Sequence, residues 1–236
     1  MTVDKKNLPE KVGSQDVTDF LNKLAQMPSL KTSQGSGRLM FAMDATASRE
    51  PTWDQACHIQ GEMFLATQGL GGLEVQLVFF RGFGECKTSS WMASSEELVK
   101  RMTSVNCRGG RTQILKILKH AIKETGARKV NALVYVGDSM EENVDDLCHS
   151  AGELGVLGVP MFVFQEGNDP VAMQAFKQFA LLTSGAHCHF NSSSASQLKD
   201  LLAAVAVFAA GGLPALEVYG KSAGETVAQI TSQVKP

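Results

Sequence analysis

The segment "MFAMDATASRE" (residues 40–50) joins an apolar run to three regularly spaced side chains that carry oxygen. The apolar residues lead directly to Asp44, and hydroxyl residues follow at every second position, Thr46 and Ser48, with alanines between them. In an extended segment, residues i, i+2 and i+4 point to the same side. We therefore predict a buried strand that ends at Asp44, with the oxygens of Asp44, Thr46 and Ser48 converging on one point.

Apolar runs and helical patterns alternate along the rest of the chain. The sequence predicts strands at 38–43, 74–80, 85–92, 130–137, 159–164 and 186–190, and helices at 51–68, 94–102, 113–125, 143–154, 171–182 and 195–210. Apolar strands that alternate with helices are typical of a parallel sheet covered on both faces. Only "RGFG" separates the second and third strands, which indicates a hairpin. We predict a doubly wound, Rossmann-like α/β fold whose mostly parallel sheet has one antiparallel edge strand.

These elements place one domain between two shorter segments. Residues 38–210 contain all of the predicted strands and form the domain. Residues 1–37 are predicted to be an N-terminal arm, with an amphipathic helix around Phe20 and the Gly/Ser linker "KTSQGSG". Residues 211–236 are predicted to be a C-terminal tail.

The composition restricts the possible partners. The chain has 236 residues, 44% of them hydrophobic and 19% charged, with a net charge of −2. Proteins that bind nucleic acids or anionic membranes usually have an excess of positive charge, which this chain lacks, so we expect neither as a partner. The apolar run "LLAAVAVFAAGGL" (201–213) is shorter than the roughly 20 residues that cross a bilayer. The N-terminal residues do not resemble a secretory signal, and five cysteines without a CxxC pair suit a reducing compartment, so we expect a cytoplasmic protein.

Two more oxygen donors are expected at the same edge of the sheet as Asp44. Asp138 ends the strand in "VNALVYVGD", and Thr112 ends the loop "CRGGRT" just before a helix. Ligands of open α/β sheets gather at the carboxyl ends of the strands. Two carboxylates and three hydroxyls suit a hard cation, Mg²⁺ or Mn²⁺, and suit zinc poorly. Because hydroxyls are neutral ligands, the cation would keep positive charge for an outside anion.

These motifs resemble the von Willebrand factor type A (VWA) domain with a metal-ion-dependent adhesion site (MIDAS), of the bacterial intracellular type. The family pattern is Asp-x-Ser/Thr-x-Ser after the first strand, a Thr in a second loop and an Asp after the fourth strand. "DATAS", the Thr of "GGRT" and the Asp of "VGDS" match it in order over residues 38–210. The resemblance implies that Asp44, Thr46, Ser48, Thr112 and Asp138 bind the metal, directly or through water.

The resemblance also carries expectations about partners. In the family, a carboxylate of the partner protein often completes the coordination of the metal, and intracellular members act as adaptors in complexes, some of them with ATPases. Two positions depart from the family pattern. Thr46 stands where Ser is commoner, and Arg111 precedes Thr112 where Gly is often found. The charge of Arg111 could attract an acidic partner or compete with the cation.

Several of these residues also have simpler interpretations. Asp, Thr and Ser are preferred at helix N-caps, so the cluster at Asp44 could be a cap. Arg108 and Arg111 could be solvated loop residues beside the turn glycines of "RGGR". The segment "GDSMEENVDDL" places four acidic residues near a helix start: Glu141, Glu142, Asp145 and Asp146. We expect them only to interact favourably with the helix dipole.

Two further patterns are set aside. The Cys–His neighbours at 57–58, 148–149 and 187–189 lack zinc-ligand spacing. The segment "ALEVYGKS" (215–222) fits a loosened phosphate-loop pattern, but the mechanism needs a strand before the loop and a helix after it within a sheet. We therefore expect neither a zinc site nor ATP binding.

The sequence favours a metal-dependent protein-interaction module that is not an enzyme. The main alternative is a metal-dependent phosphohydrolase with Asp44 as nucleophile. Such enzymes use Asp-x-Asp, in which the second Asp is the general acid, and the corresponding Thr46 cannot act as that acid at neutral pH. A VWA domain with an empty, purely structural site is the other alternative.

Overall fold

A computed structural model of the chain describes residues 36–67, 72–190 and 195–234. These residues form a six-stranded sheet in the order β3-β2-β1-β4-β5-β6. The strands are β1 (Gly37–Asp44), β2 (Leu73–Arg81), β3 (Glu85–Met92), β4 (Ala132–Gly137), β5 (Met161–Glu166) and β6 (Ala186–Phe190). All neighbours are parallel except the β2–β3 hairpin, so the predicted fold class is confirmed. The amphipathic helix of the N-terminal arm lies outside the described residues.

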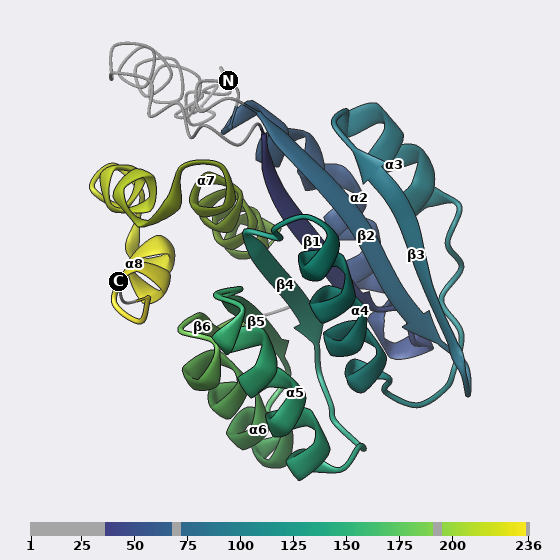
Figure 1. The fold of residues 1–236 in the computed structure, drawn as a ribbon. Coiled ribbons are helices and arrows are strands. Elements are labelled where there is room, and N and C mark those ends of the chain that lie inside the picture. Colours follow the sequence, from purple (N-terminus) through teal and green to yellow (C-terminus); the bar gives the residue numbers. More distant parts are fainter. Residues whose placement is uncertain (1–35, 68–71, 191–194, 235–236) are drawn as a thin grey trace, which may run out of the picture.

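Helices cover both faces of this sheet (Figure 1). They are the 3₁₀ turn η1 (Ala47–Arg49), α2 (Glu50–Leu65), α3 (Ser95–Thr103), α4 (Ile114–Ala127), α5 (Val144–Val156), α6 (Pro170–Leu182), α7 (Ala195–Gly220) and α8 (Glu225–Thr231). One hydrophobic cluster joins the sheet to α2, α3, α7 and α8, and a second joins it to α4, α5 and α6. The sheet is therefore the middle of three layers.

Strand β1 lies at the centre of the sheet and is buried along its whole length. Its side chains alternate between the two layers: Phe41 and Met43 join the cluster with α2 and α7, and Met40 and Ala42 join the one with α4 and α5. At its start, Gly37 lies so close to α7 that a Cβ there would be 2.3 Å from the Ala209 carbonyl oxygen. The apolar run before Asp44 therefore fixes both the position of β1 and the side of the sheet at which the chain leaves it.

Helix α7 is longer than the sequence analysis predicts. It continues past residue 210 through a kink at Gly212, whose φ of 70° suits glycine, and it includes Pro214. Its Ser196–Gly220 segment is long and apolar enough to cross a membrane by length and composition alone. In this structure 61% of its most apolar stretch is buried, as in the core helix of a globular domain.

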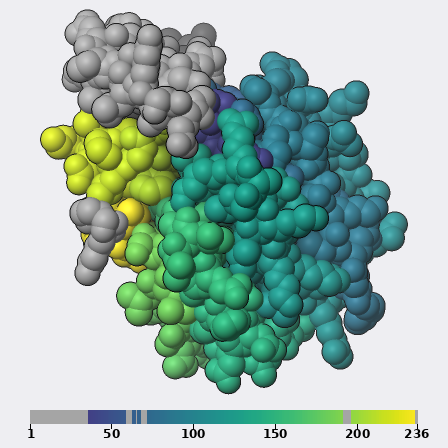
Figure 2. All heavy atoms as spheres, viewed as in Figure 1, coloured from purple at the N-terminus to yellow at the C-terminus, as the bar shows by residue number. Residues whose placement is uncertain are grey.

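The residues after the kink pack against the domain and reach the far edge of the sheet. Leu216, Val227 and Ile230 belong to the hydrophobic cluster of the α7 face. The Gln233 side chain donates to the carbonyl of His187 on β6 and accepts from the His187 N–H, both at 3.0 Å. Figure 2 shows the yellow C-terminal residues against the green edge of the molecule. The segment predicted as a tail thus contains α8, which the sequence analysis misses.

Candidate metal site

The predicted site residues lie at the carboxyl edge of the sheet, in three loops. Loop 1 (residues 44–49) follows β1, loop 2 (104–113) precedes α4, and loop 3 (138–143) follows β4. Strands β1 and β4 are parallel neighbours, with Met43 opposite Val136, so loops 1 and 3 begin side by side. In Figure 1 this edge is the one toward which the arrows of β2 and β4 point.

Loop 1 brings its oxygens together by a turn and not by an extended segment. The N–H of Thr46 donates to Asp44 Oδ1 at 2.7 Å, and residues 47–49 then form the 3₁₀ turn η1. The expectation that Asp44, Thr46 and Ser48 share one side of an extended segment is therefore wrong. Their oxygens are nevertheless brought together, because the side chain of Asp44 competes with the strand for the backbone N–H.

The hydroxyl groups connect loop 1 to loop 3. Thr46 Oγ1 and Ser48 Oγ are 3.2 Å apart, and Ser48 Oγ donates to Asp138 Oδ2 at 3.3 Å. The second oxygen of that carboxylate, Oδ1, accepts from Ser139 Oγ at 3.2 Å. Thr46 is the N-cap of η1 but makes no capping hydrogen bond with its side chain, which disfavours the helix-cap interpretation.

Asp44 is the buried member of the cluster, with only 1% of its surface exposed. Oδ1 binds Thr46, whereas Oδ2 is buried and has no hydrogen-bond partner in the part of the chain that the structure describes. Burial raises the pKa of Asp44 to about 6, opposed by its hydrogen bonds with Thr46, while the charge of Asp138 raises it further. Buried carboxylate oxygens in proteins nearly always have a donor or a cation. The unpartnered Oδ2 therefore fits a metal ligand.

Loop 2 places Thr112 against loops 1 and 3. The N–H of Arg108 donates to the carbonyl of Ala45 at 3.0 Å, next to Asp44. Thr112 is 6% exposed and makes two reciprocal bonds: its Oγ1 accepts from the N–H of Glu141 at 3.1 Å, and its own N–H donates to Glu141 Oε2 at 3.2 Å. Loop 3 therefore holds Thr112 directly.

Glu142 makes a second connection between loops 2 and 3. The N-cap of α4, Gln113, makes no capping bond with its side chain. Instead, Glu142 accepts from the N–H of Ile114 at 2.5 Å and from that of Leu115 at 3.0 Å. The expectation that Glu141 and Glu142 only favour the dipole of α5 is thus wrong, because Glu141 binds loop 2 and Glu142 binds the start of α4. Asp145 is in the first turn of α5, as expected.

Glu142→Ala should lower the free energy of unfolding by about 1–3 kcal/mol, because it leaves two N–H groups at the start of α4 without their acceptor. Urea unfolding followed by circular dichroism measures the change. Glu142→Gln keeps one acceptor oxygen and should lose less. Asp146→Ala is the matched control, since Asp146 is an exposed acid in the first turn of α5. Equal losses in Glu142→Ala and Asp146→Ala would contradict the assignment.

A buried ion pair, which no sequence pattern predicts, lies next to loop 1. Arg49 directly follows Ser48, is 1% exposed and binds Glu166 at the end of β5, which also accepts from Thr52 Oγ1 at 2.6 Å. Burial lowers the pKa of Arg49, while the charges of Asp138 and Asp44 raise it. Its Nε and Nη2 have no hydrogen-bond partner among the described residues. Arg49 thus fixes the end of loop 1 to a third strand and places a positive charge near the two carboxylates.

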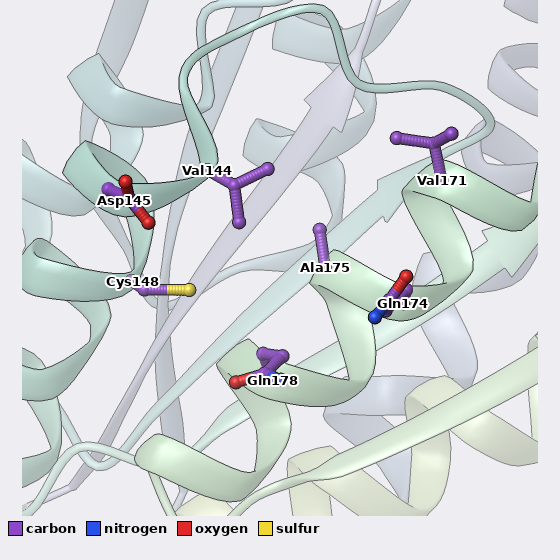
Figure 3. Close-up of a pocket in the computed structure, with 7 residues that line it drawn as sticks. All are labelled: Val144, Asp145, Cys148, Val171, Gln174, Ala175 and Gln178. Carbon is purple, nitrogen blue, oxygen red and sulfur yellow. The ribbon is translucent and has the colours of Figure 1, made fainter.

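Three further features lie apart from the five predicted metal ligands. Within the described ranges, no group of three or more His, Cys, Asp or Glu side chains is placed to hold a metal ion. Residues 215–220 of the phosphate-loop pattern are helical, so the strand that this motif needs is missing. A groove of about 390 Å³ lies between α5 and α6. In Figure 3, Val144 and Val171 lie toward the top of the view and the sulfur of Cys148 points from α5 toward the α6 side.

Cation binding should weaken as the pH falls through the raised pKa of Asp44. A metal ion must displace the proton that the metal-free site holds below about pH 6. The apparent Kd for Mn²⁺ should therefore rise about tenfold between pH 7.5 and pH 5. Water-proton relaxation measures it, with circular dichroism at both pH values to show that the fold persists. An affinity that stays constant over this range would exclude Asp44 as a ligand.

A scan against protein-family models and a search of curated protein sequences find no match to this chain. Solved structures do match. A von Willebrand factor type A protein from Catenulispora acidiphila is similar with TM-score 0.60 and 12% identity over 73% of this chain and 43% of that chain. The SpRpn10 VWA domain gives TM-score 0.56 and 13% identity over 71% of this chain and 94% of that one.

The third comparison is proximal thread matrix protein 1 from the mussel byssus, in a structure with a zinc-occupied MIDAS motif. Its TM-score is 0.58, with 19% identity over 73% of this chain and 48% of that one. This chain thus spans less than half the length of the Catenulispora and mussel proteins. At these identities the comparisons establish the fold alone, and that fold is the VWA fold.

Proposed function

We propose that this chain is a divalent-metal-dependent interaction module that binds an acidic residue of a partner protein. The residues that would hold the metal are Asp44, Thr46, Ser48, Thr112 and Asp138. The observation that carries the proposal is the unpartnered Oδ2 of the buried Asp44, beside a hydrogen-bonded group of hydroxyls and a second carboxylate. The expected setting is the cytoplasm and the expected role is that of an adaptor.

The donor set indicates the kind of cation. Carboxylate and hydroxyl oxygens are the ligands that Mg²⁺ and Mn²⁺ take in proteins. With two carboxylates, the binding should be weak, with a Kd on the order of 0.1–1 mM for Mg²⁺. When bound, such a cation supplies a positive charge with coordination positions open to an outside carboxylate. The bonds that join loops 1, 2 and 3 would hold the ligating side chains of this chain in place around it.

The alternative in which Asp44 attacks a phosphate has less support. A nucleophilic carboxylate must present an oxygen to its substrate. Here Oδ1 accepts the Thr46 N–H at 2.7 Å, and the residue is 1% exposed. Only the buried Oδ2 remains, and it is the oxygen that we assign to the metal. We therefore propose a non-enzymatic role and expect purified protein to release no phosphate from p-nitrophenyl phosphate in Mg²⁺.

Affinity capture from native lysate tests the proposal. Partners should be retained by the immobilised chain in Mg²⁺, and lost in chelator and with Thr112→Ala. Thr103→Ala is the matched control, because Thr103 is exposed on α3 and its hydroxyl binds only carbonyls of its own helix. Circular dichroism confirms that each variant is folded. Partners that are retained equally in chelator and by Thr112→Ala would place the interface elsewhere.

A further inference from the structure

An exposed aromatic side chain stands at the same edge of the sheet as the candidate metal site. Phe83 is 85% exposed at the tip of the β2–β3 hairpin, between Gly82 and Gly84. Strand β2 runs parallel to β1 with Phe80 opposite Asp44, so the tip extends beyond the level of Asp44. In Figure 1 the tip lies at the lower right, where β2 and β3 meet. Among the described large hydrophobic residues of this edge, Phe83 is the most exposed.

Loop 2 and α4 hold this tip in place. The N–H of Arg111 donates to the Gly82 carbonyl at 3.0 Å, and Lys116 Nζ donates to the Gly84 carbonyl at 2.8 Å. Gly110 lies against the tip so closely that a Cβ would be 2.1 Å from the Gly82 carbonyl oxygen. The backbone that carries Phe83 is therefore braced before any partner arrives. A braced aromatic residue loses little conformational entropy on binding, which suits an anchor.

Two arginines connect this tip to the candidate metal ligands. Arg111 directly precedes Thr112, and the backbone of Arg108 binds Ala45 next to Asp44. Both arginines are exposed. Neither side chain makes an ion pair with another described residue. Loop 2 therefore carries two exposed positive charges that no ion pair among the described residues neutralises.

The other side of the site has the opposite charge. Asp145 and Asp146 are exposed in the first turn of α5. An acidic ligand would be repelled there and attracted to the side of loop 2. The groove between α5 and α6 lies on the acidic side, and nothing in the structure shows what would cover it. The charge pattern thus favours the hairpin side.

We propose that the hairpin tip and loop 2 form the part of the partner-binding surface that determines which partner sequences bind. The partner would be an acidic segment of a protein that carries three features: the Asp or Glu that binds the metal, a second acidic side chain for Arg108 and Arg111, and an apolar side chain that packs on Phe83. This inference rests on the proposed function. It goes beyond it in assigning the sequence preference of the partner to residues that do not bind the metal.

The test is selection from a displayed library of twelve-residue peptides with one fixed central Asp and random flanks, against the immobilised full chain in Mg²⁺. The enriched peptides should share an acidic and an apolar residue on the same side of the fixed Asp. One such peptide is then synthesised, and its Kd is measured against each variant. Phe83→Ser and the double variant Arg108→Gln, Arg111→Gln should each weaken its binding about tenfold. The double variant should also bind with less dependence on salt.

The chain offers matched controls. Val156→Ser removes another apolar residue, 90% exposed at the far end of α5, and Lys123→Gln removes an exposed positive charge late in α4. Both should bind the peptide as the parent does. Metal-dependent binding that neither Phe83→Ser nor the double variant changes would overturn this inference and leave the proposed function standing. Peptide binding that persists in chelator would overturn both this inference and the proposed function. A library that yields no binder in Mg²⁺ would overturn this inference, and the lysate capture would then decide on the proposed function.

Discussion

Replacement of Glu166 by alanine is expected to lower the free energy of unfolding by about 3–5 kcal/mol, because it leaves a buried guanidinium without the carboxylate that pairs with it. Arg49 is 1% exposed and can neither move its charge to water nor lose its proton at neutral pH. Glu166 and Arg49 form an ion pair, and the remaining nitrogens of Arg49 have no other described partner. Urea unfolding at neutral pH measures the loss.

Arg49→Met is the matched comparison. It removes the cation and leaves Glu166, whose side chain is 16% exposed and which keeps its bond from Thr52 Oγ1. The loss should therefore be smaller than in Glu166→Ala, and in the double variant Arg49→Met, Glu166→Ala much of the loss should be recovered. If Glu166→Ala lowers the free energy of unfolding by less than about 1 kcal/mol, the pair contributes no more than a surface salt bridge. Arg49 would then not fix the end of loop 1 to β5.

Asp44→Asn should abolish cation binding and, in chelator, stabilise the protein at neutral pH. Folding raises the pKa of Asp44 from 3.8 to about 6, mainly through burial. The charged carboxylate is therefore disfavoured in the folded state. The stability that its protonated form contributes is fully present below pH 3.8 and is lost as the pH rises through 6. At pH 7.5 the penalty is about 3 kcal/mol.

The neutral amide that Asp44→Asn introduces avoids this penalty and can keep the bond from the Thr46 N–H. In chelator the variant should unfold at a higher urea concentration than the parent at pH 7.5, and the difference should disappear near pH 4. Saturating Mn²⁺ should stabilise the parent and leave the variant unchanged. A variant that Mn²⁺ stabilises as much as the parent would remove Asp44 from the site. If the variant is less stable than the parent in chelator at pH 7.5, the buried carboxylate of Asp44 does not destabilise the metal-free protein as we infer.

The sheet could be predicted well from the sequence because most strands are short apolar runs between turn residues. The polar β3 could be placed because only the turn "RGFG" separates it from β2. The run before Asp44 and that before Asp138 both end where the structure ends β1 and β4. Helix α8 is missed although Val227, Ile230 and Val234 have helical spacing, because seven helical residues near the end of the sequence resemble a tail. The kink at Gly212 is likewise hidden within a continuous apolar run.

The candidate site could be predicted less completely than the sheet. Its five oxygen-bearing residues could be named, because carboxylates and hydroxyls at strand ends have a recognisable pattern. The turn at Thr46 could not, since it depends on one hydrogen bond between a side chain and the backbone. The bonds of Glu141 and Glu142 to Thr112 and α4 join segments far apart in the sequence. Such contacts leave no local signal.

The bonds between Gln233 and His187 have a consequence for the behaviour of the chain in concentrated solution. Strand β6 is the last strand on its side of the sheet, and an uncovered strand of this kind is a template on which another chain can extend the sheet into an aggregate. Because one amide group occupies both backbone groups of His187, an incoming strand cannot pair through this position without first displacing the C-terminal segment. Gln233 therefore blocks strand pairing at His187, and its loss would leave this position of β6 open to pairing with another chain.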